Sequence, residues 1–154
     1  MKKIMLITVC VMFMFAMVSD GSMAQDKAKK TAKEYIADLS SSDEATVVSA
    51  EEWIADNKEK SALPKLQELL RSDNRVSVRL FAAIALGEIA DESSAEILNN
   101  ALLNDPNADV RYTVLLAIAR VGSKSSFDVV QKAKESEQDP FIKDLLNKME
   151  DKLK

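Results

Sequence analysis

The sequence contains no histidine and a single cysteine, and these two absences exclude most familiar enzyme chemistries. Without histidine, the chain cannot build the usual serine triad or an iron site with His and Glu ligands. Cys10 lies inside an apolar segment near the N-terminus, so the rest of the chain has neither a thiol nucleophile nor a disulfide. We therefore expect no enzymatic activity and no cofactor.

Glycine and proline are also scarce, with three of each in 154 residues. Gly21, Gly87 and Gly122 are far apart, which excludes a glycine-rich phosphate loop, and no Asp-x-Asp-x-Asp-Gly calcium loop occurs. The chain carries 21 Lys and Arg residues against 25 Asp and Glu residues. This acidic excess argues against a nucleic-acid partner, because such proteins normally present a basic patch.

One long apolar run occurs, and it lies at the N-terminus. After Lys2 and Lys3, 15 residues from Ile4 to Val18 are apolar except for Thr8. The run is shorter than the about 20 residues of a membrane span, and the small residues of Ser22-Met23-Ala24 follow it. This pattern predicts a cleaved signal peptide over residues 1–24, export to a bacterial periplasm, and no membrane span after cleavage. An uncleaved N-terminal anchor is the alternative.

Beyond residue 42, the sequence repeats with a register of 32 residues. The copies VSVRLFAAIALGEIADESSAEIL from Val76 and ADVRYTVLLAIARVGSKSSFDVV from Ala108 show it best. Apolar residues recur at i, i+4, i+7, i+8 and i+11 of each unit, with polar exceptions only in the first and last units, and this spacing is one face of an α-helix. In the copy from Val76 these positions are Val78, Ala82, Ala85, Leu86 and Ile89. A second stripe follows at Ala95, Leu98 and Leu102, so each unit contains an A helix and a B helix.

The helix boundaries follow from the caps and breakers around these stripes. We predict that Asp105-Pro106 and Asp139-Pro140 supply the N-cap and first residue of A helices, and that Ser93–Glu96 and Ser125–Asp128 are capping boxes. The expected helices are 27–40, 44–58, 62–71, 75–90, 94–104, 107–121, 125–135 and 139–152. Short turns make successive helices antiparallel.

The fold class predicted is therefore all-α, an α-solenoid of stacked antiparallel helix pairs with about three and a half repeats of 32 residues. The units span about 43–72, 73–104, 105–136 and 137–154. A charged N-terminal segment, 25–42, precedes them and is expected to cap the first unit with a short helix.

The stretch DPNADVRYTVLLAIARVGSKSSFDVV resembles a HEAT repeat of the short bacterial, phycobilisome-lyase-like type. The residues that carry the resemblance are Asp105, Pro106, Val110, Arg111, Ala117 and Ile118, and in the preceding unit Asp73, Val78, Arg79, Ala82, Ala85, Leu86, Gly87 and Asp91. The resemblance covers residues 43–154, although Val47 replaces the arginine of the pattern in the first unit. It implies a scaffold or binding surface. A few relatives are enzymes, and the missing histidine and cysteine argue against that role here.

Two sets of positions are candidate sites. Arg79, Arg111 and Lys143 occupy one column, and the resemblance implies a structural ladder in which they bridge units through Asp73, Asp105 or Asp109. The outer face of the B helices, which line the concave side in solenoids, is the candidate partner-binding surface. Its two columns are Gln67, Asn99 and Gln131, and Glu68, Asn100 and Lys132. The amides are suited to hydrogen bonds with an extended peptide, while an ordinary solvated face is the alternative.

Trp53 falls on the buried stripe of the first, divergent unit, where later units have alanine. We expect it to fill the core beside the cap, with a partner-facing anchor as the alternative. The function predicted is that of an exported scaffold or adaptor that binds an unidentified protein partner. Two other hypotheses are a periplasmic regulatory or inhibitor subunit with one dedicated enzyme or receptor partner, and a lyase-like enzyme or cofactor carrier.

Overall fold

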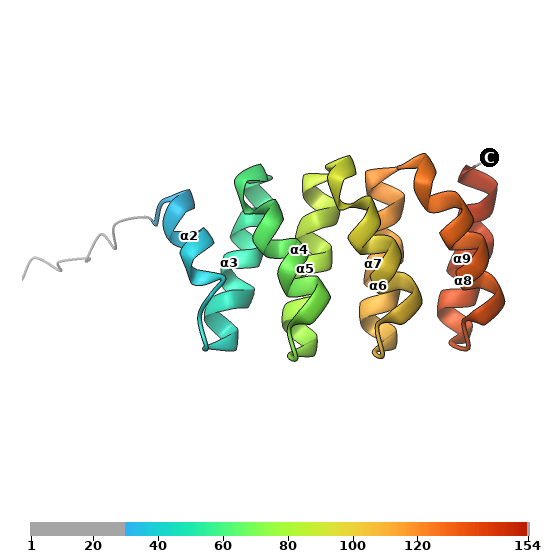
Figure 1. Ribbon diagram of the computed structural model, residues 1–154, viewed down its shortest axis with the longest axis horizontal. Coiled ribbons are helices and arrows are strands. Elements are labelled where there is room, and N and C mark those ends of the chain that lie inside the picture. Colours follow the sequence, from blue (N-terminus) through green and yellow to red (C-terminus); the bar gives the residue numbers. More distant parts are fainter. Residues whose placement is uncertain (1–29, 154) are drawn as a thin grey trace, which may run out of the picture.

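A computed structural model describes residues 30–153 and shows a two-layer array of eight α-helices within that range (Figure 1). The helices are α2 (Ala32–Asp38), α3 (Glu44–Asn57), α4 (Leu63–Ser72), α5 (Val76–Ile89), α6 (Ala95–Asn104), α7 (Ala108–Val121), α8 (Phe127–Ser136) and α9 (Pro140–Leu153). No strand occurs among these residues. The predicted all-α solenoid is confirmed, whereas the signal peptide predicted over 1–24 lies outside the described residues.

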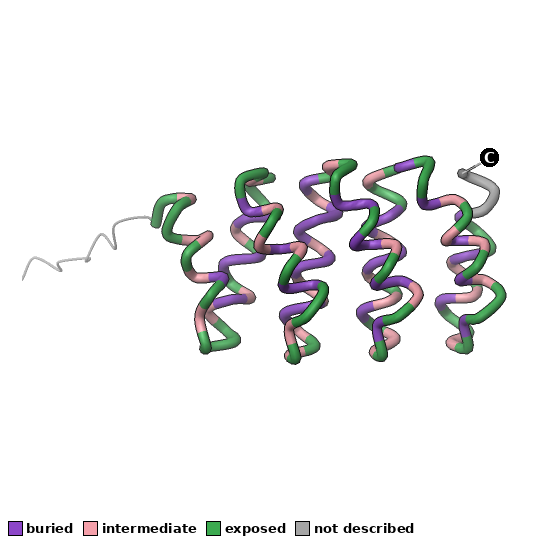
Figure 2. Tube along the Cα trace, viewed as in Figure 1, coloured by how far each residue is buried: buried purple, intermediate pink, exposed green. Residues whose placement is uncertain are grey.

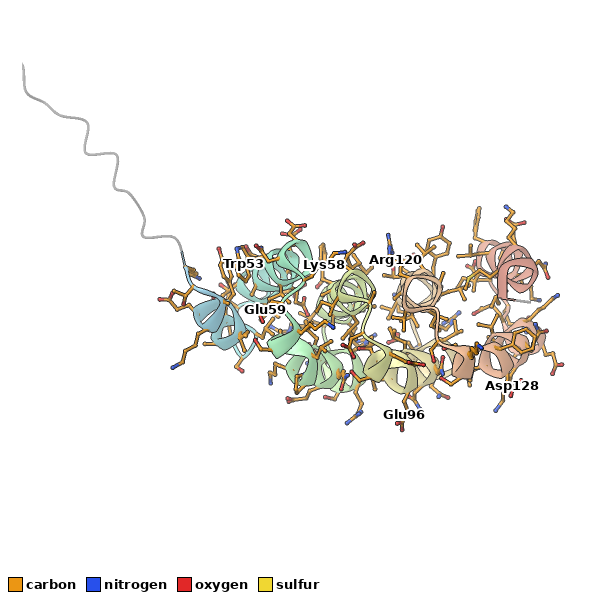
Figure 3. The ribbon with its side chains drawn as sticks, turned by 90° about the horizontal axis from the view of Figure 1, so that it is seen from above. Trp53, Lys58, Glu59, Glu96, Arg120 and Asp128 are labelled. Atoms are coloured by element: carbon orange, nitrogen blue, oxygen red, sulfur yellow. The ribbon has the colours of Figure 1, made fainter. Side chains whose placement is uncertain are left out.

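The helices alternate between two layers along the array. The A layer holds α3, α5, α7 and α9, and the B layer holds α4, α6 and α8 (Figure 3). The predicted stripes face each other between these layers and form one continuous core (Figure 2). Val78, Ala82, Leu86, Val110 and Leu146 in this core are fully buried. Stacking is needed because a single helix pair cannot cover its own apolar stripe.

Only one of the two predicted proline caps is correct. The carboxylate of Asp139 accepts hydrogen bonds from the amides of Phe141 at 2.9 Å and Ile142 at 3.1 Å, so α9 starts as expected. Helix α7 instead starts at Ala108, with Asn107 as its N-cap. The Asp105-Pro106 prediction was wrong because the Asp105 carboxylate is engaged elsewhere, as described below.

The two predicted capping boxes were also wrong. Each B helix is preceded by a 3-10 turn, at Lys60–Ala62, Glu92–Ser94 and Lys124–Ser126. In the second turn, Asp91 accepts from the Ser93 amide at 3.1 Å and from its hydroxyl at 2.7 Å, while Ser94 makes no side-chain cap. The sequence pattern therefore marked the right place but assigned the capping role to Ser93 and Ser125, two positions after the observed caps Asp91 and Ser123.

The A helices end in a left-handed residue at the same position of three successive units. Lys58, Ala90 and Gly122 have φ values of 49°, 52° and 65°. Only glycine adopts this conformation without a steric penalty, so the third unit has the favoured residue. Glycine has a different role at Gly87 in α5, where an added Cβ would lie 2.9 Å from the Cα of Ala117. Because Gly87 has no Cβ, α5 and α7 can approach each other closely.

Helix α2 lies against α3 at the N-terminal end of the array, and Leu39 just after it is buried. The ring of Tyr35 in α2 stacks on Trp53 of α3, with centroids 4.2 Å apart and planes 8° from parallel. Trp53 packs against the core, as expected, but it remains partly exposed. Its added bulk relative to alanine is thus covered by the aromatic ring of the preceding helix.

Candidate partner-binding surface

The structure places all six predicted partner-binding residues on the B layer, two on each helix. Glu68 of α4, Asn100 of α6 and Lys132 of α8 are exposed, whereas the amides one position earlier are half-buried. Those half-buried amides are Gln67, Asn99 and Gln131. The two columns therefore run side by side across the three helices.

Some of these side chains have partners within the chain. The Gln67 amide donates to the Ser93 carbonyl at 3.3 Å, so it also joins α4 to the turn before α6. Glu68 pairs with Lys65 of the same helix at 3.1 Å. By contrast, the buried Oδ1 of Asn99 and the buried Nε2 of Gln131 have no hydrogen-bond partner among the described residues. Such unpaired buried groups cost stability, typically about 1–3 kcal/mol each.

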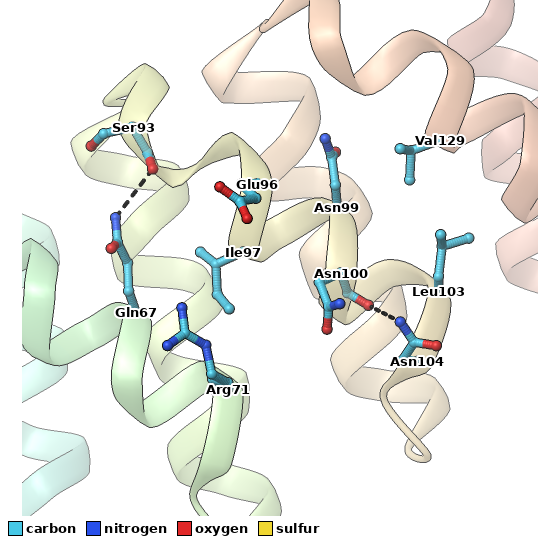
Figure 4. A pocket seen from close by; sticks show the side chains of 10 residues that line it. All are labelled: Gln67, Arg71, Ser93, Glu96, Ile97, Asn99, Asn100, Leu103, Asn104 and Val129. Atoms are coloured by element: carbon cyan, nitrogen blue, oxygen red, sulfur yellow. Dashed lines mark hydrogen bonds between the residues drawn. The ribbon is translucent and has the colours of Figure 1, made fainter.

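A groove of about 500 Å³ opens on this face and crosses the three B helices (Figure 4). Its walls include Gln67 and Arg71 from α4 and Asn100 and Asn104 from α6, while Val129 of α8 lies at its far side. The Asn104 side chain donates to the carbonyl of Asn100 at 3.0 Å. A further pocket of about 270 Å³ continues from the same walls toward Asp105. Of the six predicted residues, Gln67, Asn99 and Asn100 line this depression, whereas Glu68, Gln131 and Lys132 do not.

The sequence reasoning missed Arg71, Leu103 and Asn104, which also line this groove. Arg71 and Leu103 share one column of the 32-residue register, one helical turn after the amide column. A test of every B-helix position at i+4 from the amides would have found them, since such residues share a helix face.

The structural ladder is present at two of the three predicted positions. The guanidinium of Arg79 in α5 binds both carboxylate oxygens of Asp105, at 2.8 and 3.1 Å, and donates to the carbonyl of Asp73 at 2.9 Å. Arg79 and Asp105 are both buried. Each arginine of this kind therefore ties its A helix to the turn before it and to the turn after its unit.

The same arrangement recurs one unit later with a different acid. Arg111 binds both oxygens of Glu137, at 2.8 and 2.9 Å, and donates to the carbonyl of Asp105 at 2.9 Å. The hydrogen bonds from Arg111 lower the pKa of Glu137 to about 2. Asp109, which we had considered as a bridging acid, is exposed and does not take part. Lys143, the third predicted member, has no ion-pair partner within the described part of the chain.

In the first unit a different arginine supplies the missing contacts. Val47 occupies the ladder position of α3, and Arg75 from the turn before α5 binds Asp73 instead, with distances of 2.9 and 2.7 Å. The same guanidinium reaches the carbonyls of Ser41 at 3.5 Å and Ser42 at 3.4 Å. The Ser41 carbonyl is the one that an arginine at position 47 would reach, because Ser41 precedes position 47 by six residues, as Asp73 precedes Arg79. The hydrogen bonds from Arg75 lower the pKa of Asp73.

Glu51 lies one helical turn after Val47, where the next two units have Ala83 and Leu115. Its side chain is fully buried, and neither carboxylate oxygen has a hydrogen-bond partner among the described residues. Burial raises the pKa of Glu51 to about 9, and nearby Asp73 adds to this effect while Arg75 opposes it. The side chain is therefore a neutral carboxylic acid at neutral pH.

Metal and membrane sites were also sought. No group of three or more Cys, Asp or Glu side chains within the described residues is arranged to hold a metal ion. Among the same residues, every helix is too short or too polar to cross a membrane.

Two comparisons with known proteins address the family. The family model described as HEAT repeats matches residues 32–108. The chain belongs to the HEAT-repeat family. Among curated proteins, no relative matches it.

A solved structure is similar in fold to this HEAT-repeat chain. It is the complex of CpcE and CpcF of phycocyanin lyase from Nostoc sp. PCC7120, which matches with a TM-score of 0.63 at 24% sequence identity. The match covers 73% of this chain but only 45% of the other, so this chain spans less than half of that protein. At this identity the likeness concerns the fold.

Proposed function

We propose that this protein is a non-catalytic scaffold or adaptor whose B layer binds a protein partner. The observation that carries the proposal is the groove that crosses α4, α6 and α8, whose walls hold the side-chain amides of Gln67, Asn99, Asn100 and Asn104. A pre-formed surface loses little conformational entropy on binding, which favours recognition. The similar fold of CpcE and CpcF, two chains that form a complex, adds support for a protein partner.

The proposed setting is the periplasm of a bacterium, reached through cleavage after Ala24. Mass spectrometry of the protein from its native envelope gives the mature N-terminus directly. A start at Gln25 is expected, whereas a retained Met1 would favour the membrane anchor instead.

The partner-binding role is tested by a triple substitution, Asn99→Ala, Asn100→Ala and Gln131→Ala. Helicity should be unchanged, and the melting temperature unchanged or slightly raised, because two of the removed side chains hold unsatisfied polar atoms. Partner binding, measured by photo-crosslinking from position 132, should fall. A matched control, Glu52→Ala with Asp109→Ala, alters exposed residues of the A layer and should leave crosslinking intact. Equal crosslinking in both variants would exclude the B layer as the binding face.

A dedicated regulatory or inhibitor subunit is the second candidate. It differs from a general scaffold in having one tight partner rather than several. Affinity capture of the mature chain after crosslinking separates the two, because a single stoichiometric adduct is expected only for the dedicated subunit.

A further inference from the structure

The B layer carries a third column whose chemistry changes from unit to unit. Arg71 on α4, Leu103 on α6 and Glu135 on α8 are equivalent positions of the 32-residue register. Arg71 and Glu135 are exposed, and Leu103 is half-buried beside the groove. Across the face, a bound chain would therefore meet a cation, then an apolar side chain, then an anion.

Arg71 differs from the ladder arginines in having no carboxylate partner within residues 30–153. Arg75, Arg79 and Arg111 each bind an acid of their own chain, whereas the Arg71 guanidinium borders both pockets of the groove. Guanidinium groups bind carboxylates through two parallel hydrogen bonds, and a partly enclosed groove strengthens such pairs. Arg71 is thus available for an acidic side chain of a bound molecule.

Leu103 supplies the apolar part of the same groove on the side of α6 that faces Val129, whereas Ile97 lies on the other side of α6, near Arg71 (Figure 4). Leu103 and Val129 are half-buried. An apolar side chain placed between these two would remove their remaining surface from water.

The spacing of the units selects the conformation of the bound chain. Neighbouring helices in such arrays pack about 8–10 Å apart. A polyproline II segment advances about 3.1 Å per residue and returns to the same side every third residue, a step of about 9 Å. In a β-strand, by contrast, residues three apart point to opposite sides. The backbone of a polyproline II segment has no internal hydrogen bonds, so its peptide groups are free to bond with the exposed amide of Asn100.

Resting on the proposed function, we propose that the groove binds an extended polyproline II segment of a protein partner. The segment presents an acidic side chain to Arg71, an apolar side chain three residues on to Leu103, and a basic side chain three residues further to Glu135. The peptide backbone lies beside the exposed amide of Asn100 on the wall of the groove.

The probes that test this are two fluorescein-labelled heptapeptides, Glu-Pro-Ala-Leu-Pro-Ala-Arg and its reverse. Both are needed because a segment bound in either chain direction can place its acidic, apolar and basic side chains beside Arg71, Leu103 and Glu135. Fluorescence anisotropy at low salt should detect binding of one of them. Arg71→Glu should weaken it by at least about tenfold, because a charge pair is replaced by a repulsion. Lys124→Glu makes the same charge change on an exposed turn outside the groove and should alter affinity by less than about twofold.

A charge swap distinguishes recognition at Arg71 from a change in net charge. Replacing the peptide glutamate by arginine should abolish binding to the natural chain and restore it to the Arg71→Glu variant. The inference is overturned if neither peptide binds, if both variants lose affinity equally, or if the swap restores nothing. The proposed function would survive those results if crosslinking from position 132 still depended on Asn99, Asn100 and Gln131.

Discussion

The turn between α4 and α5 differs from the turn between α6 and α7 in how its acid is held. In the later turn, Asp105 is bound by Arg79 from the preceding A helix, 26 residues earlier. In the earlier turn, Asp73 is bound by Arg75 from the turn itself. The carboxylate, guanidinium and carbonyl groups meet in the same way in both places. The array therefore preserves the interaction rather than the residue position that provides it.

Because Val47 stands where the next two units have arginine, the first unit is less well stabilised than they are. The vacated side of α3 carries Glu51, a buried acid without hydrogen bonds, where the next units have Ala83 and Leu115. Arg75 is also more exposed than Arg79, with side-chain exposures of 22% and 10%. The first turn is therefore the weaker of the two.

The largest effect is expected from Arg79→Ala. It leaves Asp105, whose side chain is only 5% exposed, without its counter-charge, so the free energy of unfolding should fall by about 3–5 kcal/mol. Arg75→Ala should cost less, because both members of its pair are better solvated. Urea denaturation of the two variants measures the difference, and the double variant Arg79→Met with Asp105→Asn should recover part of the loss. Equal losses for Arg75→Ala and Arg79→Ala would contradict the comparison.

The next largest effect should be a gain, from Glu51→Leu. The pKa of Glu51 is raised from 4.5 to about 9 in the folded chain. The free energy of unfolding is therefore highest below pH 4.5 and falls as the pH rises toward 9, because the unfolded chain releases this proton more readily. At pH 7 the variant should be more stable by about 3 kcal/mol. Between pH 5 and 9, the melting temperature of Glu51→Leu should decline less steeply with pH than that of the natural chain. The matched variant Ala83→Glu should introduce the same pH dependence into the second unit, and an unchanged slope in Glu51→Leu would refute the assignment.

A smaller loss is expected from Gly87→Ala at the contact between α5 and α7. The added Cβ meets backbone of Ala117, which cannot move aside freely, so a loss of about 1–3 kcal/mol should follow. The equivalent residue of α3 is Ala55, so that helix already accommodates the methyl group. Ala55→Gly is the matched control and tests the contact of α3. A stabilised Gly87→Ala variant, measured by thermal melting, would show that the helices can separate without loss.

The smallest predicted effect is at the ends of the A helices. Ala90→Gly should raise stability by up to about 1 kcal/mol, because glycine adopts the left-handed conformation that Ala90 holds at a φ of 52°. Gly122→Ala should lower it by a similar amount, although its new Cβ would meet nothing within 4 Å. Opposite signs in chemical denaturation would confirm a conformational cause, whereas changes of the same sign would exclude it.

Much of the fold could be predicted because its periodicity is local. From α3 onward, the predicted boundaries lie within two residues of the observed ones, since apolar stripes and breakers are written along the chain. The cap at Asp105 could not be predicted in this way, because the carboxylate binds an arginine 26 residues earlier. The Asp105 carboxylate can either cap the nearby helix or bind the distant arginine, and the buried ion pair with Arg79 is the interaction that forms.

The candidate surface was less predictable than the fold. The amide columns at Asn99 and Asn100 were visible because their chemistry repeats, and they do border the groove. Arg71 and Leu103 were missed because their column has a different chemistry in every unit. Specificity in a repeat array resides in such non-repeating positions. Columns of uniform chemistry therefore indicate where a binding surface lies, but not which residues distinguish one partner from another.

The arginine clamps have a mechanical consequence. The clamps at Arg79 and Arg111 each fasten one A helix to the turns on both sides of its unit, and Arg75 links the turn before α5 to the carbonyls of Ser41 and Ser42, so the clamps are connected end to end along the array. If the two ends of the chain were pulled apart, the same tension would pass through every clamp in turn. The array would then unfold first where the clamp is most exposed, at Arg75, so unfolding under tension would begin at its N-terminal end.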